Sequence, residues 1–185
     1  MRSPRSARFA CLVLALGTVA GVACAAEMNI AVELPKLDVA EYHRPYVAMW
    51  IEREDQSFVA NVSLWYQEKR GGGGGAGPGG EGGTKWLNEL RTWWRKNGRE
   101  QASFPIDGVT GPTRPAGIQQ LKITGDKAPL ASLAPGKYRL VVEAARENAG
   151  REVVRVPFEW PAKSAQSQTS KGSTELGTVA VNVSP

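Results

Sequence analysis

Apolar and polar residues alternate along most of this chain, which is the pattern of β-strands with one buried face. Every second residue from Met28 to Leu34 is large and apolar. Two further apolar runs, residues 46–51 and 58–66, flank a charged connector that contains the turn formers Asp55 and Ser57. Runs of this composition separated by a turn predict an antiparallel pair of strands.

Four later segments have the same β-rich composition, and they are residues 118–124, 137–145, 152–160 and 175–183. The sequence Asn148-Ala149-Gly150 predicts a hairpin turn between the second and the third of them. Roughly seven strands with turn signals between them predict a mainly β protein, an antiparallel β-sandwich.

One segment has a helical period instead. Over residues 84–98 the apolar side chains are spaced for one face of a helix, with Thr84 as its cap and Gly98 as its left-handed end. Three tryptophans, Trp86, Trp93 and Trp94, lie on this face. The favoured interpretation is that they close one edge or open end of the sandwich. The alternative is a binding surface in which exposed rings and neighbouring basic residues stack against a glycan or a nucleic acid.

A glycine-rich segment, residues 71–83, precedes the predicted helix and holds ten of the 21 glycines. No Gly-Lys-Ser/Thr follows it, so it lacks the mark of a phosphate-binding loop. We expect a flexible loop, and a second mobile connection at residues 161–173, which are rich in Ser, Gln and Lys.

Residues 1–26 have the three parts of a secretory signal peptide: basic residues, an apolar run over residues 9–23, and small residues over 23–26. The apolar run is too short to cross a bilayer comfortably, so cleavage is expected rather than membrane insertion. Cys24 could instead carry the lipid of a lipoprotein, but residues 21–23 lack the usual leucine, so this ranks second. We expect a periplasmic protein with one domain, residues 27–185.

Removing this leader changes the composition. It takes away three of the 23 basic residues and none of the 18 acidic ones, so the mature net charge is 20 minus 18, or +2. Such a small charge gives no support to a nucleic-acid partner, and export makes one unexpected. Both cysteines, Cys11 and Cys24, lie in the leader, and His43 is the sole histidine. The chain therefore lacks the residues for a thiolate metal site, and we expect no metal and no enzymatic activity of its own.

The acidic residues have structural explanations. Glu52, Glu54 and Asp55 have the pattern of a solvated hairpin turn, and Glu143 and Glu147 flank Arg146 where cross-strand ion pairing is expected.

Residues 107–113 (DGVTGPT) form the most unusual short segment. As a turn, it offers Asp107 to accept backbone N–H groups, glycines that tolerate positive φ, and Pro112 to stiffen its end. A well-exposed Thr113 after such a turn would be accessible to a modifying enzyme.

An ordered set of segments gives the chain a resemblance to a known family. The set consists of residues 44–52 (RPYVAMWIE), Leu64-Trp65, Trp86-Leu87, Trp93-Trp94, and residues 107–117 (DGVTGPTRPAG), 135–138 (PGKY), 143–147 (EAARE) and 175–177 (ELG). Together they resemble the predicted periplasmic proteins of domain of unknown function 2271, over nearly the whole mature chain. The Pro-Ala-Gly and Pro-Gly-Lys-Tyr segments are also similar to the immunoglobulin-like domain of flagellar hook-capping proteins, which implies an immunoglobulin-like sandwich.

The resemblance also implies partners. Members of this family occur with PepSY-type membrane proteins and with the FAD:protein FMN transferase, which attaches FMN to a threonine or serine of exported redox proteins. Its acceptor motif is similar to Asp107, Thr110, Gly111 and Thr113, with Pro112 where the motif has alanine.

Two hypotheses follow. The chain is an accessory of an extracytoplasmic flavin-dependent electron-transfer system, carrying covalent FMN on Thr113 or docking beside a flavin-bearing membrane partner. Alternatively, it is a cofactor-free structural module that binds a protein or a glycan.

Overall fold

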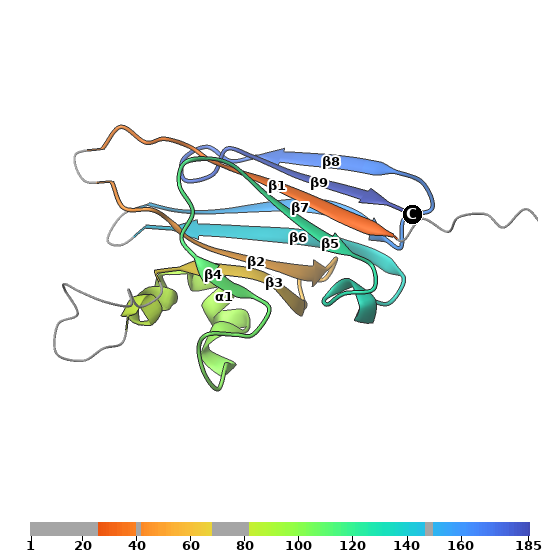
Figure 1. Ribbon diagram of the computed structural model, residues 1–185, viewed down its shortest axis with the longest axis horizontal. Coiled ribbons are helices and arrows are strands. Elements are labelled where there is room, and N and C mark those ends of the chain that lie inside the picture. The colour runs from red at the N-terminus through yellow and green to blue at the C-terminus, as the bar shows by residue number, and fades with distance from the viewer. Residues whose placement is uncertain (1–25, 40–41, 68–81, 147–149) are drawn as a thin grey trace, which may run out of the picture.

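A computed structural model describes residues 26–39, 42–67, 82–146 and 150–185 (Figure 1). Almost all of the predicted signal peptide and most of the predicted glycine-rich loop lie outside these ranges, as does Glu147.

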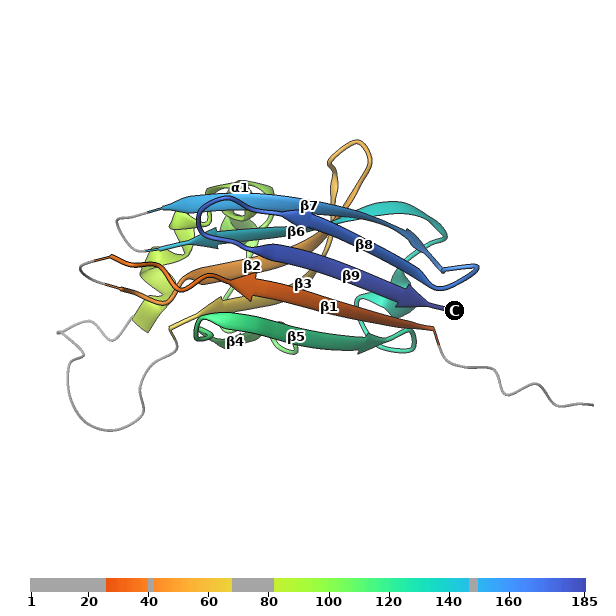
Figure 2. The same ribbon diagram turned by 90° about the horizontal axis from the view of Figure 1, so that it is seen from above.

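Within the described residues, nine strands form two sheets that lie face to face (Figures 1 and 2). The four-stranded sheet has the order β5 (Gly117–Thr124), β1 (Glu27–Leu34), β9 (Thr178–Ser184), β8 (Gln166–Lys171). The five-stranded sheet has the order β4 (Thr110–Pro112), β3 (Phe58–Tyr66), β2 (Tyr46–Arg53), β6 (Gly136–Ala145), β7 (Arg151–Trp160). All neighbours are antiparallel except β3 and β4, which are parallel. The predicted mainly β sandwich is confirmed.

The core explains the two kinds of apolar pattern in the sequence. The large apolar residues of β1, Met28, Ile30, Val32 and Leu34, are at most 1% exposed and lie between the sheets, as their alternation predicts. Strand β2 has no such alternation because both of its faces are buried. Val47, Met49 and Ile51 belong to the core between the sheets, whereas Ala48 and Trp50 belong to a second core on the outer face.

Helical segments cover that second core. They are η1 (Gly82–Glu89), α1 (Arg91–Lys96) and η2 (Gly98–Glu100), and Figure 1 shows α1 on the outer face of the five-stranded sheet. A short η3 (Leu130–Ser132) lies between β5 and β6 in the chain. We call η1, α1 and η2 together the insert. The sandwich therefore has a third, helical layer on one side only.

The prediction of one continuous helix over residues 84–98 is wrong, because the helical structure is divided into shorter segments. A 3-10 helix ends at Glu89, and a six-residue α-helix follows Leu90. Gly98 does not end the helix in the left-handed region; it begins η2 and is fully packed. A Cβ at this position would lie 2.6 Å from the Trp93 ring, so the glycine is needed for close approach.

The sequence missed two strands and misplaced the start of a third. Strand β8 lies inside the predicted mobile connection of residues 161–173, where its polar residues carry no alternation. Strand β4 has only three residues. Strand β9 begins at Thr178 rather than at Glu175. The predicted hairpin between β6 and β7 is confirmed by their antiparallel pairing, up to Ala145 opposite Arg151, although residues 148 and 149 of its turn lie outside the described ranges.

The loop before β9 is held by a carboxylate from β7. Glu152 accepts backbone N–H groups at 2.7–3.0 Å from four consecutive residues, Ser173, Thr174, Glu175 and Leu176. Burial raises the pKa of Glu152, but these hydrogen bonds outweigh it and lower the pKa from 4.5 to about 2. The ionised carboxylate is therefore part of the folded structure.

The variant Glu152→Gln is expected to lose stability that depends on pH. Because the folded pKa lies below the ordinary one, the carboxylate stabilises the fold fully above pH 4.5 and loses this effect as the pH falls toward 2. Allowing for solvent screening, we expect a loss of about 2 kcal/mol at pH 7 and little difference near pH 2. Urea unfolding at both pH values measures this, with the exposed Glu159→Gln as the matched control. An equal loss at both pH values would contradict the assignment.

Candidate functional site

The predicted tryptophan surface is largely buried. Trp93 is 0% exposed, and its Nε1 donates a hydrogen bond of 2.8 Å to Asn61 on β3. Trp86 and Trp94 are half-buried against the same outer core. The rings cover the outer face of the five-stranded sheet rather than one of its edges or open ends. Trp93 therefore contributes packing, and it cannot be part of an exposed binding surface.

Glu143, on β6, fixes the insert to the sheet. Its side chain is fully buried and accepts the backbone N–H groups of Thr92 at 3.0 Å and Trp93 at 2.8 Å. Arg151 donates a third hydrogen bond of 2.8 Å, so Glu143 forms a cross-strand ion pair as predicted, whereas Arg146, which Glu143 and Glu147 flank in the sequence, pairs with Glu175 instead. Leu90 supplies no side-chain cap to α1, so a carboxylate from a distant strand satisfies the first turn instead.

Glu52 lies at the other end of α1, and its prediction as part of a solvated turn is wrong. It is 0% exposed, accepts a hydrogen bond of 2.8 Å from the indole N–H of Trp50, and forms an ion pair with Lys96, with 3.0 Å between nitrogen and oxygen. Arg155 lies 3.7 Å away. The signal was present in the sequence, because Glu52 follows Ala48 and Trp50 on one face of the strand. Both buried carboxylates thus bind the insert to the sheet.

The segment with the predicted acceptor motif begins as a tight turn. The carbonyl of Ile106 accepts the N–H groups of Val109 at 3.2 Å and Thr110 at 3.0 Å. The Thr110 hydroxyl accepts the N–H of Ile106 at 2.8 Å. Gly108 has a φ of 67°, which a side chain would disfavour. Asp107 is exposed and accepts no hydrogen bond from the described part of the chain, so Thr110 closes the turn that Asp107 was expected to close.

After the turn, the segment adds an edge strand to the five-stranded sheet. Strand β4 runs parallel to β3, with Gly111 opposite Trp65 and Pro112 opposite Tyr66. Gly111 therefore has an extended conformation and no positive φ. Pro112 lacks an N–H group, which an edge strand tolerates because one side of the strand needs no partner. This pairing ties the segment to a rigid sheet.

Thr113 follows directly after β4. It is half-buried rather than well exposed, whereas Pro112 and Arg114 on either side of it are exposed. Among the described residues, no group forms a hydrogen bond with the Thr113 hydroxyl. The two threonines of the segment thus differ: the hydroxyl of Thr110 accepts a hydrogen bond in the turn, and that of Thr113 has no partner within residues 26–39, 42–67, 82–146 and 150–185.

These residues fit a group attached through a phosphoester. The fit rests on an unengaged hydroxyl at Thr113, on exposed neighbours that leave the chain accessible, and on the cationic Arg114 beside it. Arg114 lies over the ring of Trp65, with Cζ 5.5 Å from the ring centre. We name Thr110, Gly111, Pro112, Thr113 and Arg114 the β4 segment.

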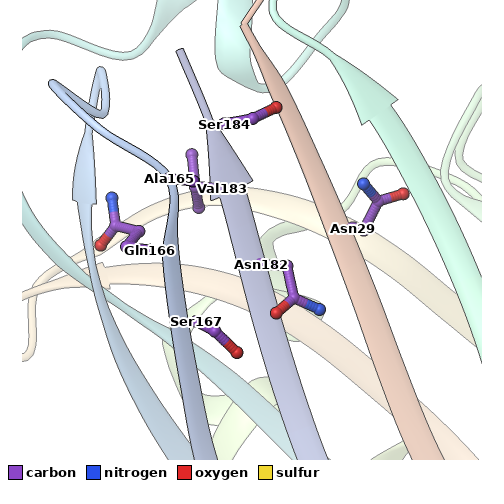
Figure 3. Close-up of a pocket in the computed structure, with 7 residues that line it drawn as sticks. All are labelled: Asn29, Ala165, Gln166, Ser167, Asn182, Val183 and Ser184. Carbon is purple, nitrogen blue, oxygen red and sulfur yellow. The ribbon is translucent and has the colours of Figure 1, made fainter.

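A separate shallow hollow lies on the outer face of the four-stranded sheet (Figure 3). Asn29, Ser167 and Asn182 line it from three neighbouring strands. Its volume of about 230 Å³ is below the usual range for small-molecule sites, so it offers contacts but little enclosure.

The remaining chemistry-bearing residues do not assemble into a site. Among the described residues, no group of three or more His, Cys, Asp or Glu side chains is placed to hold a metal ion. His43 is exposed in the segment before β2. None of the helices in the described part of the chain has the length and apolarity needed to cross a bilayer.

The fold and the β4 segment define a β-sandwich with a one-sided helical cover and an edge strand followed directly by a threonine whose hydroxyl has no hydrogen-bond partner among the described residues. Comparison with protein families gives a match over residues 27–178 to the family described as predicted periplasmic protein, domain of unknown function 2271. The chain belongs to this family, and the predicted periplasmic location agrees with the family's description. No curated protein and no solved structure matches the chain, so the similarity to the immunoglobulin-like domain of hook-capping proteins stays a prediction.

Proposed function

We propose that this protein is a non-catalytic component of an extracytoplasmic flavin-dependent electron-transfer system, and that it carries FMN covalently on Thr113. The observation that carries the proposal is the Thr113 hydroxyl directly after an edge strand, which has no hydrogen-bond partner in the described part of the chain, whereas the hydroxyl of Thr110 in the same segment is used by the fold. The motif residues Asp107, Thr110, Gly111 and Thr113 support the same proposal.

The attachment is a group transfer from FAD, catalysed by the FAD:protein FMN transferase. A bond forms between Thr113 Oγ1 and the phosphorus of the FMN half, the pyrophosphate P–O bond to AMP breaks, and AMP leaves. The hydroxyl proton passes to solvent. No electron is transferred in this step, so it needs no oxidant or reductant.

The chain itself contributes by positioning the Thr113 hydroxyl for the transfer. Pairing of β4 with β3 fixes the acceptor on a rigid sheet, and Pro112 restricts the backbone directly before it. When bound, FMN supplies one- and two-electron redox chemistry. The expected electron partner is a PepSY-type membrane protein, which the family resemblance suggests.

The test is export of the full chain in cells that also produce the transferase. We expect a yellow protein whose intact mass has increased by one FMN phosphoryl group, with the visible absorption of flavin. A colourless chain of unchanged mass, from cells that do modify a known substrate of the transferase, would contradict the proposal.

The alternative is a cofactor-free module that binds a glycan or a protein. The shallow hollow beside Asn29 and Asn182 favours it, since amide groups on a flat sheet suit hydrogen bonding to sugar hydroxyls. The buried Trp93 weighs against the tryptophan surface as the binding site. A colourless protein that retains a periplasmic glycan would favour this alternative.

A further inference from the structure

Arg114 differs from the arginines that stabilise the fold. Arg146, Arg151 and Arg155 each lie within 4 Å of a glutamate, at 2.7, 2.8 and 3.7 Å. Arg114 is exposed, and no carboxylate of the described residues pairs with it. Its recorded contact is instead the face of an aromatic ring, 5.5 Å from Cζ to the centre of Trp65. The cation beside Thr113 is thus oriented but not neutralised.

The ring of Trp65 supports the Arg114 guanidinium in a fixed position. Trp65 is 2% exposed and lies in the core between the sheets, and its backbone pairs with Gly111. A guanidinium on an aromatic face is attracted by the ring, while the N–H donors on its own edge stay available. A planar fork of N–H donors matches the oxygens of a phosphate group better than an ammonium does.

We infer that Arg114 is the phosphate-binding residue of this site: it pairs with the phosphodiester that links FMN to Thr113, and Trp65 holds it in place. This inference rests on the proposed function. The diester carries one negative charge, and the adjacent Arg114 carries a positive charge that no carboxylate of the described residues neutralises. Pairing the two restricts rotation about the bonds that join the flavin to the chain.

The test compares the wild-type chain, Arg114→Gln, Arg114→Lys and the control Arg99→Gln, each exported together with the transferase. Arg99 is also exposed but lies in η2 of the insert. Time-resolved fluorescence anisotropy of the attached flavin measures its local rotation. We expect the fast-decaying fraction to rise on the order of twofold in Arg114→Gln, because a charge-assisted hydrogen bond is lost. Arg114→Lys should be intermediate, and Arg99→Gln should equal the wild type.

Each outcome decides between the inference and the proposed function. Equal anisotropy in all four chains would overturn the role of Arg114 while leaving flavin attachment intact. A wild-type chain without flavin would overturn both. If Arg114→Gln alone remains unmodified, the positive charge is needed to receive the phosphoryl group, which supports the inference. If Arg114→Lys is unmodified as well, a positive charge at position 114 is not sufficient for modification, and the inference is wrong.

Discussion

Thr113→Ala is expected to carry no FMN at all when it is exported with the transferase, whereas the wild-type chain is fully modified. The reason is chemical, since alanine has no hydroxyl to form the phosphoester. The fold should tolerate the change: the Thr113 hydroxyl has no partner among the described residues, so the stability should change by less than about 0.5 kcal/mol. Intact mass and thermal unfolding of the same sample measure both effects.

Two control variants make this result specific. Thr113→Ser keeps a hydroxyl at the same place and should still be modified, because the acceptor motif takes either residue. Thr169→Ala removes an exposed threonine from the edge strand β8 and should leave the modification unchanged. An FMN adduct that persists in Thr113→Ala would show that another residue is the acceptor.

Glu143→Ala is expected to destabilise the protein by about 3–5 kcal/mol, since it removes a fully buried carboxylate that accepts three hydrogen bonds. The change leaves Arg151 without its carboxylate and the buried N–H of Trp93 without an acceptor. It also removes the negative charge at the first turn of α1. Urea unfolding followed by tryptophan fluorescence measures the loss and reports on the insert, which carries Trp93.

The matched control is Glu54→Ala, an exposed carboxylate on the turn after β2. It should change the free energy of unfolding by less than about 0.5 kcal/mol. A double-mutant cycle with Arg151→Ala separates the ion pair from the helix cap. If Glu143→Ala and Glu54→Ala cost the same, Glu143 does not hold the insert.

The strands that the sequence predicted share a physical cause. Where one face of a strand is buried and the other is solvated, as in β1, apolar and polar residues alternate in the sequence. Strand β8 has no apolar face, because it lies at a sheet edge and packs little of its surface. Its assignment depends on hydrogen bonds to β9, which composition does not encode.

The insert shows how tertiary contacts override local signals. The tryptophan spacing predicted a helical face, and the rings do pack on one side. The helical structure is interrupted at Leu90, and Glu143 from another strand caps the α-helix that follows. No local sequence pattern indicates so distant a partner. For the same reason Glu52 resembled a surface residue: the layer that covers it comes from elsewhere in the chain.

The sequence singled out residues 107–113, but it predicted their conformation only in part. The positive φ of Gly108 follows from the turn chemistry of the sequence. The roles of Asp107 and Thr110 do not, because both side chains can close such a turn and only the structure distinguishes them. The partial burial of Thr113 depends on the pairing of β4 with β3, which links residues about forty-six positions apart, as Thr110 opposite Leu64 shows.

Peptide mapping of the exported protein tests the central claim most directly. Trypsin is expected to release residues 100–122 as one peptide, because Pro115 protects the bond after Arg114. The account predicts that this peptide carries one FMN phosphoryl group and that fragmentation places it on Thr113. An unmodified peptide, from cells in which a control substrate is modified, or an adduct on any other residue, would contradict it.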